Sequence, residues 1–185
     1  HDICPDLGQI LRALTLGGFE KMVNDCKIQL FTPIAPMLAN PTHSLVQVEQ
    51  AITKMQNSVV LEWKYDGVRC QAHHNGSSTK LYSRHLLETT AQFPDAIQSI
   101  LEARRDSKLV TSFIIDAEIV GIEGEGENSR LLPFQDLATR KKKDDGAGVK
   151  VKVFAFDLMF LNGKSYVEEP LWKRRELLRE VFRET

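Results

Sequence analysis

Lys64-Tyr65-Asp66-Gly67-Val68-Arg69 is the most informative stretch of the sequence. An apolar run over residues 59–63 precedes it and predicts a mostly buried strand. Asp-Gly is a strong signal for a hairpin turn, and residues 69–74 supply a returning strand. The pattern therefore predicts a β-hairpin with Lys64 at its mouth.

Lys64 is a candidate nucleophile in this pattern. A lysine side chain attacks only as the neutral amine, a form that partial burial and neighbouring cations such as Arg69 and Arg84 favour. An exposed hairpin with a solvated lysine gives the same short pattern, so Lys-x-Asp-Gly alone has a high false-positive rate. Polar residues at later strand ends strengthen the case for a site: Ser83-Arg84, Asp116-Ala117-Glu118 and Asp157.

Outside the hairpin, the apolar spacing predicts a mixture of helices and strands. Helices are expected over residues 6–25, with a break at Gly17-Gly18, and over residues 45–55, 92–104, 134–140 and 171–182. Further strands are expected over residues 79–83, 112–122 and 149–157, with a surface loop from Gly121 to Arg130 and a turn at Asn162-Gly163. The predicted fold class is α+β with a mainly antiparallel sheet flanked by helices.

The composition fits one globular core and disfavours several other classes of protein. The chain has 185 residues, 42% apolar and 26% charged, which suffices for one core and a piece of a second. Its net charge of -1 leaves nucleic-acid binding open, because only one face need be basic. Residues 139–143 are either such a basic patch or a solvated loop. The three cysteines indicate neither a zinc site nor a disulfide framework, and no membrane span is visible.

Ordered motifs along the chain are more specific than any one of them. They are residues 31–39 (Phe-Thr-Pro-Ile-Ala-Pro-Met-Leu-Ala), residues 62–69, Ser83-Arg84, Asp116-Ala117-Glu118, residues 133–141 and residues 156–163. In this order they resemble the ATP-dependent DNA ligases, of the eukaryotic replicative, ligase-I-like type. The resemblance implies the end of a helical DNA-binding domain over residues 1–30, a linker over 31–42, and part of a nucleotidyltransferase (adenylation) domain over 43–185.

The resemblance also implies a reaction. Lys64 attacks the α-phosphate of ATP, pyrophosphate leaves, and AMP remains on the lysine as a phosphoramidate. The AMP then passes to the 5′-phosphate of nicked double-stranded DNA, and the neighbouring 3′-hydroxyl displaces it. Mg²⁺ would bridge phosphate oxygens in this chemistry. The residues implied in binding ATP are Glu62, Lys64, Arg69, Arg84, Glu118 and Phe156, and Glu118 is also the implied Mg²⁺ ligand.

Each implied role has a physical rationale. Glu62 would accept a hydrogen bond from the adenine amino group, and Phe156 would stack on the base. The planar forks of Arg69 and Arg84 suit phosphate and ribose oxygens. Glu118 would bind the ribose hydroxyls or the metal. The competing structural roles are a surface ion pair for Arg84 with Glu118 and a core position for Phe156.

The chain departs from the family pattern in two respects. His85 stands where the family has a small polar residue such as Asn. Nothing after Thr185 supplies the family's later motifs or its OB-fold domain, so we expect a fragment that is inactive in nick sealing by itself. An mRNA-capping or RNA-ligase relative and a non-catalytic DNA-binding fragment stay open as alternatives. Replication or repair partners and a nuclear location, with the mitochondrion as the alternative, are further expectations of the resemblance.

Overall fold

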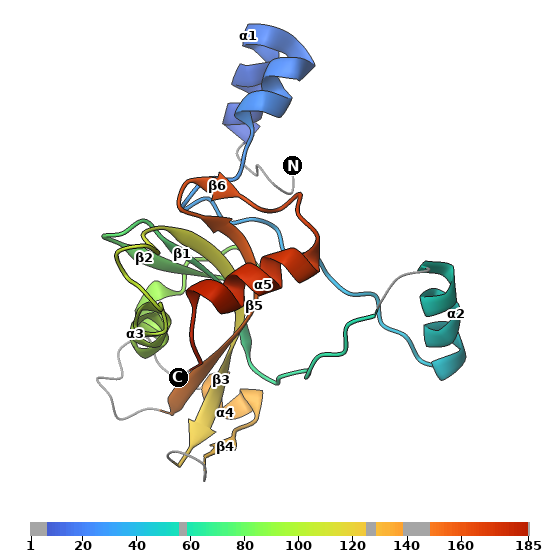
Figure 1. Cartoon of the computed structure of the whole chain (residues 1–185), viewed down its shortest axis with the longest axis vertical. Helices are drawn as coiled ribbons and strands as arrows, with labels where there is room; N and C mark the ends of the chain where they lie inside the picture. The colour runs from blue at the N-terminus through green and yellow to red at the C-terminus, as the bar shows by residue number, and fades with distance from the viewer. Residues whose placement is uncertain (1–6, 56–58, 125–128, 139–148, 185) are drawn as a thin grey trace.

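A computed structural model describes residues 7–55, 59–124, 129–138 and 149–184. The helices are α1 (Leu7–Asp25), α2 (Leu45–Met55), the short 3-10 helix η1 (Thr90–Gln92), α3 (Pro94–Glu102), α4 (Phe134–Ala138) and α5 (Leu171–Val181). The strands are β1 (Val68–His74), β2 (Thr79–Ser83), β3 (Phe113–Glu123), β4 (Arg130–Leu131), β5 (Lys150–Leu161) and β6 (Lys164–Ser165). Figure 1 shows one curled sheet with α3 and α5 beside it, and the mixture of helices and strands confirms the α+β class.

The sheet has the strand order β2-β1-β3-β5-β6, with β4 beside β3. Every described pairing is antiparallel, as predicted. In the register between β1 and β3, Arg69 lies opposite Glu118 and Gln71 lies opposite Asp116. This cross-strand register brings together residues that are about 50 positions apart in the sequence.

One face of the sheet carries the main apolar core. Side chains alternate between the two faces of a strand, so Phe113, Ile115 and Ala117 of β3 share this face. Helix α3 packs on it through Ile100, and α5 packs on it through Leu178. Burial of these apolar side chains, worth about 1.5–3 kcal/mol for each large one, holds the two helices to the sheet.

The opposite face carries the polar residues of the first strands and a covering segment. The alternate residues on this face are Arg69, Gln71 and His73 of β1 and Ile114, Asp116 and Glu118 of β3. Residues 28–34, which have no strand or α-helix, cross this face, where Ile28 and Ile34 pack on Ile114. The candidate site and the segment before α2 therefore lie on the same side of the sheet.

Helices α1 and α2 stand apart from the sheet in Figure 1. Helix α1 breaks at Gly17 and Gly18, whose backbone angles are not helical, as predicted. Helix α2 has the predicted bounds, and its Leu45 is 87% exposed. No helix in the described ranges combines the length and the apolarity that crossing a membrane requires.

The segment before the nucleophile is not the predicted buried strand. Residues 59–66 have no regular secondary structure, and Leu61 and Trp63 are 94% and 85% exposed. The predicted hairpin at Asp66-Gly67 is also wrong. Strand β1 already pairs with β2 along one edge and with β3 along the other, so no edge is left for the preceding residues.

Gly67 is required for a close approach of two chain segments rather than for a turn. A Cβ atom at this position would lie 2.3 Å from the carbonyl oxygen of Ile119. The backbone at Gly67 therefore lies directly against β3, and its N–H donates a hydrogen bond to the Glu118 carboxylate. This contact brings the chain that carries Lys64 to the polar face of the sheet.

Two further loop predictions have different outcomes. Asn162 and Gly163 have φ angles of 47° and 85° and connect β5 to β6, which confirms the predicted turn. The surface loop predicted from Gly121 is partly wrong, because β3 continues to Glu123 and Gly121 is buried. The candidate basic patch at residues 139–143 lies outside the described residues.

Candidate active site

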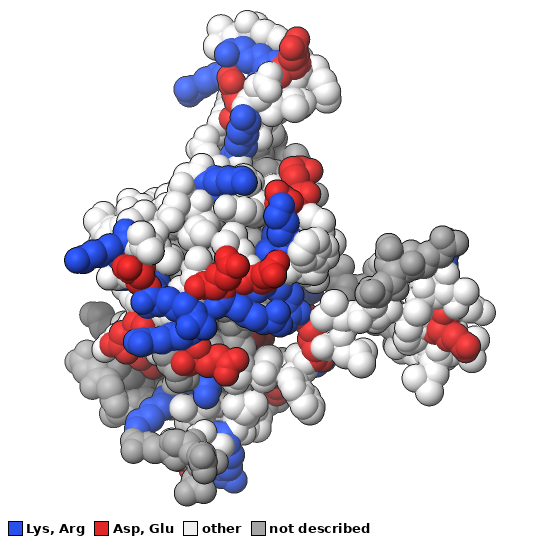
Figure 2. All heavy atoms as spheres, in the orientation of Figure 1, with Lys and Arg blue, Asp and Glu red and all other residues white. Residues whose placement is uncertain are grey.

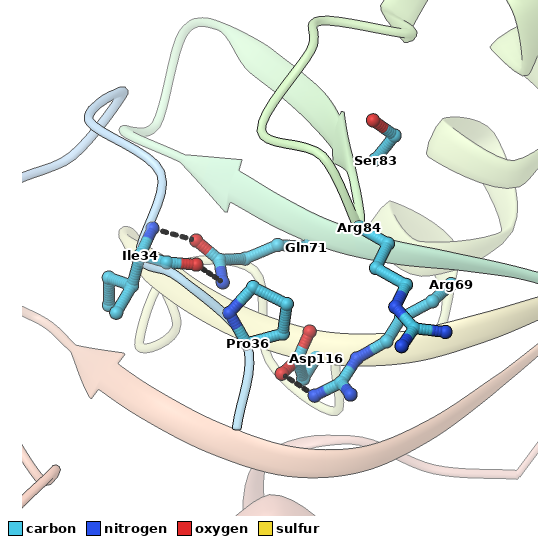
Figure 3. A pocket seen from close by; sticks show the side chains of 7 residues that line it. All are labelled: Ile34, Pro36, Arg69, Gln71, Ser83, Arg84 and Asp116. Carbon is cyan, nitrogen blue, oxygen red and sulfur yellow. Dashed lines mark hydrogen bonds and ion pairs between the residues drawn. The ribbon is translucent and has the colours of Figure 1, made fainter. Parts of the chain in front are cut away.

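A small pocket opens on the face of the sheet that residues 28–34 cross (Figure 3). Its walls come from this segment and its continuation, from β1, from the end of β2 and from β3. The lining residues are Ile34, Pro36, Arg69, Gln71, Ser83, Arg84 and Asp116. The pocket accommodates a group about the size of one water molecule, so it suits a phosphate or ribose oxygen rather than a whole nucleotide.

Arg69 is the central cation of the pocket. Its Nη2 donates to Asp116 Oδ2 at 2.7 Å, and the two side chains are only 24% and 8% exposed. The guanidinium lies 5.3 Å from the centroid of the Phe156 ring, a cation–π distance. The Arg69 Nε–H is buried and has no hydrogen-bond partner among the described residues. An unpaired buried donor is costly, so an oxygen of a bound ligand would fit here.

Glu118 is a carboxylate on which the candidate nucleophile Lys64 acts electrostatically. The Glu118 side chain is half-buried, and burial raises its pKa, whereas Arg69, the Gly67 N–H and Lys64 act in the opposite direction. Burial also raises the pKa of Asp116, against the opposing effect of Arg69. Positive charge added beside either carboxylate would therefore stabilise its ionised form. No group of three or more His, Cys, Asp or Glu side chains forms a metal cage in the described ranges.

The residues next to Lys64 are anchored to other elements. The Tyr65 ring stacks on Phe154 of β5, with centroids 3.9 Å apart and planes 15° apart. Asp66 Oδ2 accepts the backbone N–H of Phe134 at 3.1 Å, at the start of α4. Lys64 itself is exposed. Its backbone is thus fixed on the C-terminal side while its side chain remains accessible to a ligand.

Arg84 adds a second cation to the pocket from the end of β2. Ser83 Oγ accepts the backbone N–H groups of His85 and Leu87, each at 3.3 Å, which shapes the turn that carries Arg84. Arg84 lines the same pocket as Arg69, whose side chain reaches toward Asp116 in Figure 3. Two guanidinium groups placed in this way favour an anion.

The structure brings five of the predicted residues together and leaves one apart. Arg69 and Arg84 line one pocket, and Arg69 lies over the Phe156 ring. Arg69 and Lys64 both act electrostatically on Glu118. Glu62 instead forms an ion pair with Arg175 of α5. Its predicted alignment with Lys64 depended on a strand that the structure does not contain. Its contact with adenine stays a prediction.

Sequence reasoning gave no role to Asp116 and Gln71, which both line the pocket. Gln71 follows Arg69 by two residues on β1, and Asp116 precedes Glu118 by two residues on β3. Because side chains repeat every two residues along a strand, each shares a face with a predicted site residue. That alternation is the signal that could have identified them.

The charge of the molecule is mixed on the face that carries α5. Figure 2 shows Lys and Arg side chains interleaved with Asp and Glu side chains over this helix. DNA binding favours a concentration of positive charge, whereas the charges on this face are mixed. The two arginines of the pocket remain the stronger candidates for phosphate contacts.

A lysine beside two arginines and a carboxylate, on an antiparallel α+β scaffold, is typical of nucleotidyl transfer. The family model described as "ATP dependent DNA ligase domain" matches residues 36–185. The chain belongs to this family of ATP-dependent DNA ligases. The predicted resemblance is confirmed, and the mRNA-capping or RNA-ligase alternative is set aside.

Relatives from several organisms match nearly the whole chain. DNA ligase 1 of Arabidopsis thaliana and DNA ligase 1 of Drosophila melanogaster are each 37% identical over 98% of this chain, covering 23% and 24% of those proteins. The DNA ligase of Sulfolobus acidocaldarius is 35% identical over 98% of this chain and 29% of that protein. The chain thus spans about a quarter of the length of these relatives.

A comparison with solved structures finds mycobacterial DNA ligase D complexed with ATP and MES. The TM-score is 0.49 and the sequence identity is 25%. The match covers 64% of this chain and 35% of that chain.

Proposed function

We propose that this chain carries the part of an ATP-dependent DNA ligase that transfers AMP from ATP to Lys64, for delivery to nicked double-stranded DNA. The observation that carries the proposal is the convergence of Lys64, Gly67 and Arg69 on Glu118, next to a pocket with a second arginine. The family to which the chain belongs supports ATP as the nucleotide.

The transfer step begins with Lys64 Nζ as the neutral amine. An N–P bond forms to the α-phosphorus, the P–O bond to pyrophosphate breaks, and the nitrogen loses a proton. Arg69 and Arg84 would neutralise phosphate charge, and the unpaired Arg69 Nε–H would find an acceptor oxygen. Little covalent chemistry is required of the protein, so positioning and charge neutralisation carry the catalysis.

Glu118 is the proposed ligand of Mg²⁺. Asp116 is already paired with Arg69, whereas Glu118 is half-buried and raised in pKa, so a cation beside it is favourable. Mg²⁺ binds through one or two carboxylates together with substrate phosphates and retains several waters. When bound, the ion would neutralise negative charge on the phosphates.

The base would bind through Phe156 and Glu62. The Phe156 ring offers adenine the face that Arg69 leaves open, a contact worth about 1–3 kcal/mol. Glu62 would exchange its ion pair with Arg175 for the adenine amino group. Such an exchange would favour ATP over GTP, since guanine presents a carbonyl oxygen at the same position.

The proposal is tested by the intact mass of the chain after incubation with Mg²⁺ and ATP, GTP or NAD. We expect a gain of one AMP with ATP alone, lost in Lys64→Ala and retained in Lys80→Ala, which removes a partly exposed lysine of β2 that pairs with Glu88. A gain that persists in Lys64→Ala would contradict the proposal. The alternative of a non-catalytic DNA-binding fragment predicts no gain at all, and a Lys64→Ala variant with only weaker, salt-sensitive DNA binding.

Nicked DNA as the substrate also supports a location where DNA is replicated and repaired. We propose the nucleus, with the mitochondrion as the alternative, and replication or repair proteins as partners. Imaging of the tagged parent protein tests the location, and exclusion from both compartments would contradict it.

A further inference from the structure

Residues 31–37, which precede α2, are held by side chains of the sheet rather than by backbone pairing. Gln71 grips Ile34 in two directions: its Oε1 accepts the Ile34 N–H at 2.8 Å, and its Nε2 donates to the Ile34 carbonyl at 3.1 Å (Figure 3). Gln71 is only 5% exposed. A buried amide that satisfies both backbone groups of one residue fixes that residue in place.

His73 extends the same network to Phe31. The Phe31 N–H donates to His73 Nδ1 at 2.9 Å, so the proton of the neutral ring lies on Nε2. That Nε2–H donates to Gln71 Oε1 at 2.8 Å. The Tyr82 hydroxyl donates to the Phe31 carbonyl at 3.0 Å. Only one arrangement of protons satisfies all of these contacts. We call Gln71, His73 and Tyr82 the linker clamp.

Apolar contacts reinforce the clamp. Ile28 and Ile34, each 6% exposed, pack on Ile114, Met159 and Phe160 of the sheet. Burial of these two apolar side chains favours the docked position of the segment. The segment before α2 is therefore packed on the sheet and does not act as a free linker.

The docked segment reaches the site itself. Pro36 lines the pocket together with Arg69 and Arg84, and Gln71 of the clamp lines it as well. The Met37 carbonyl accepts a hydrogen bond from Arg69 Nη1 at 3.4 Å, while Arg69 Nη2 is held by Asp116. The Arg69 guanidinium is thus fixed between β3 and the docked segment.

We propose that Gln71, His73 and Tyr82 are positioning residues, which fix residues 31–37 as a wall of the nucleotide site and thereby hold Arg69 in its reactive orientation. The effect of these residues on AMP transfer rests on the proposed function, whereas the docking of residues 31–37 does not. The arrangement follows a general requirement of transfer chemistry, in which a shift of about 1 Å in a positioning group costs about 100-fold in rate.

The first measurement is hydrogen exchange of individual backbone amides in the full chain. We expect slow exchange at Phe31 and Ile34, although neither lies in a helix or strand, because their N–H groups donate to buried side chains. Gln71→Leu should release Ile34, and Tyr82→Phe, which removes only the hydroxyl, should speed exchange at Phe31. Unprotected amides in the wild-type chain would overturn the clamp.

The second measurement follows Arg69 directly through the NMR signal of its Nε–H. In Gln71→Leu we expect this signal to shift toward that of free arginine. His74→Asn is the matched control, because His74 is a buried histidine of the same strand that bonds Thr79 on the other face. An unchanged Arg69 signal in Gln71→Leu, with Ile34 released, would overturn the positioning role.

The third measurement is the single-turnover rate of AMP transfer from ATP. We expect this rate to be about 10- to 100-fold lower in Gln71→Leu, and within about twofold of wild type in His74→Asn. Equal losses in both variants would show a structural role only and would overturn the proposal. If the wild-type chain transfers no AMP, the proposed function is at fault, and the exchange and NMR results still decide the clamp.

Discussion

Acid should weaken this fold through the buried imidazole of His73. His73 is fully buried and accepts a hydrogen bond through Nδ1, and burial lowers its pKa from the usual 6.5 to about 3. Below pH 6.5 the unfolded chain binds a proton at this histidine, whereas the folded chain does not until about pH 3. The free energy of unfolding must therefore fall as the pH drops through this window.

The magnitude follows from linkage. One proton bound only by the unfolded state changes the free energy of unfolding by about 1.4 kcal/mol per pH unit. Between pH 6.5 and pH 5.0 the contribution of His73 is therefore about 2 kcal/mol, a sizeable part of the roughly 5–15 kcal/mol that stabilises a typical domain.

The assay is urea unfolding, followed by circular dichroism at a series of pH values, for wild type and His73→Asn. Above pH 7 the variant should be the less stable protein, because it loses contacts of the clamp. This stability gap should shrink by about 2 kcal/mol on going to pH 5.0. His43→Asn, which removes an exposed imidazole, is the control. A gap between wild type and His73→Asn that stays constant with pH would show that His73 does not couple the stability of the fold to pH.

Three further substitutions test other parts of the account. Gly67→Ala places a Cβ atom 2.3 Å from a β3 carbonyl oxygen. Thermal unfolding should therefore show a loss of at least about 2 kcal/mol in stability, and AMP transfer should fall. Wild-type stability in this variant would contradict the close approach. Asp157→Ala leaves Arg174 without the carboxylate that its Nε and Nη2 bind at 2.7 and 2.8 Å, at a cost of about 3 kcal/mol in urea unfolding; a cost below about 1 kcal/mol would place the pair among surface ion pairs. Arg175→Gln frees Glu62 from its ion pair, so the KM for ATP should fall while stability changes by less than about 1 kcal/mol; an unchanged KM would argue against competition for Glu62.

Local patterns in the sequence predicted most of the elements of the fold. Helix α2 has the predicted bounds, because its apolar residues repeat at helical spacing and nothing distant overrides them. Strand β2 likewise matches its prediction, and the Asn162-Gly163 turn follows from residues that tolerate positive φ. These features depend only on neighbouring residues.

Features that depend on distant residues could not be predicted. The apolar run at residues 59–63 has the composition of a strand, but both edges of β1 are already paired with later strands. Gly67 was assigned to a turn because a close approach to Ile119 depends on the register of β3. Ile28 and Ile34 lie in a segment without strand or helix, so no repeating apolar pattern predicted that they pack on the sheet.

The candidate site divides in the same way. Motif order placed Lys64, Arg69 and Glu118 in one site, and the pairing of Arg69 with Glu118 across β1 and β3 explains how they meet. The partner of Glu62 could not be foreseen, because Arg175 lies 113 residues further along the chain. Asp116 belongs to one of the motifs, but its ion pair with Arg69 is visible only in the structure.

The role of Lys64 can be decided by tandem mass spectrometry of the digested chain after incubation with Mg²⁺ and ATP. We expect one AMP, carried by the side chain of Lys64 and by no other residue. AMP on a different residue, or none on a chain that demonstrably binds ATP, would contradict the assignment of Lys64 as the nucleophile.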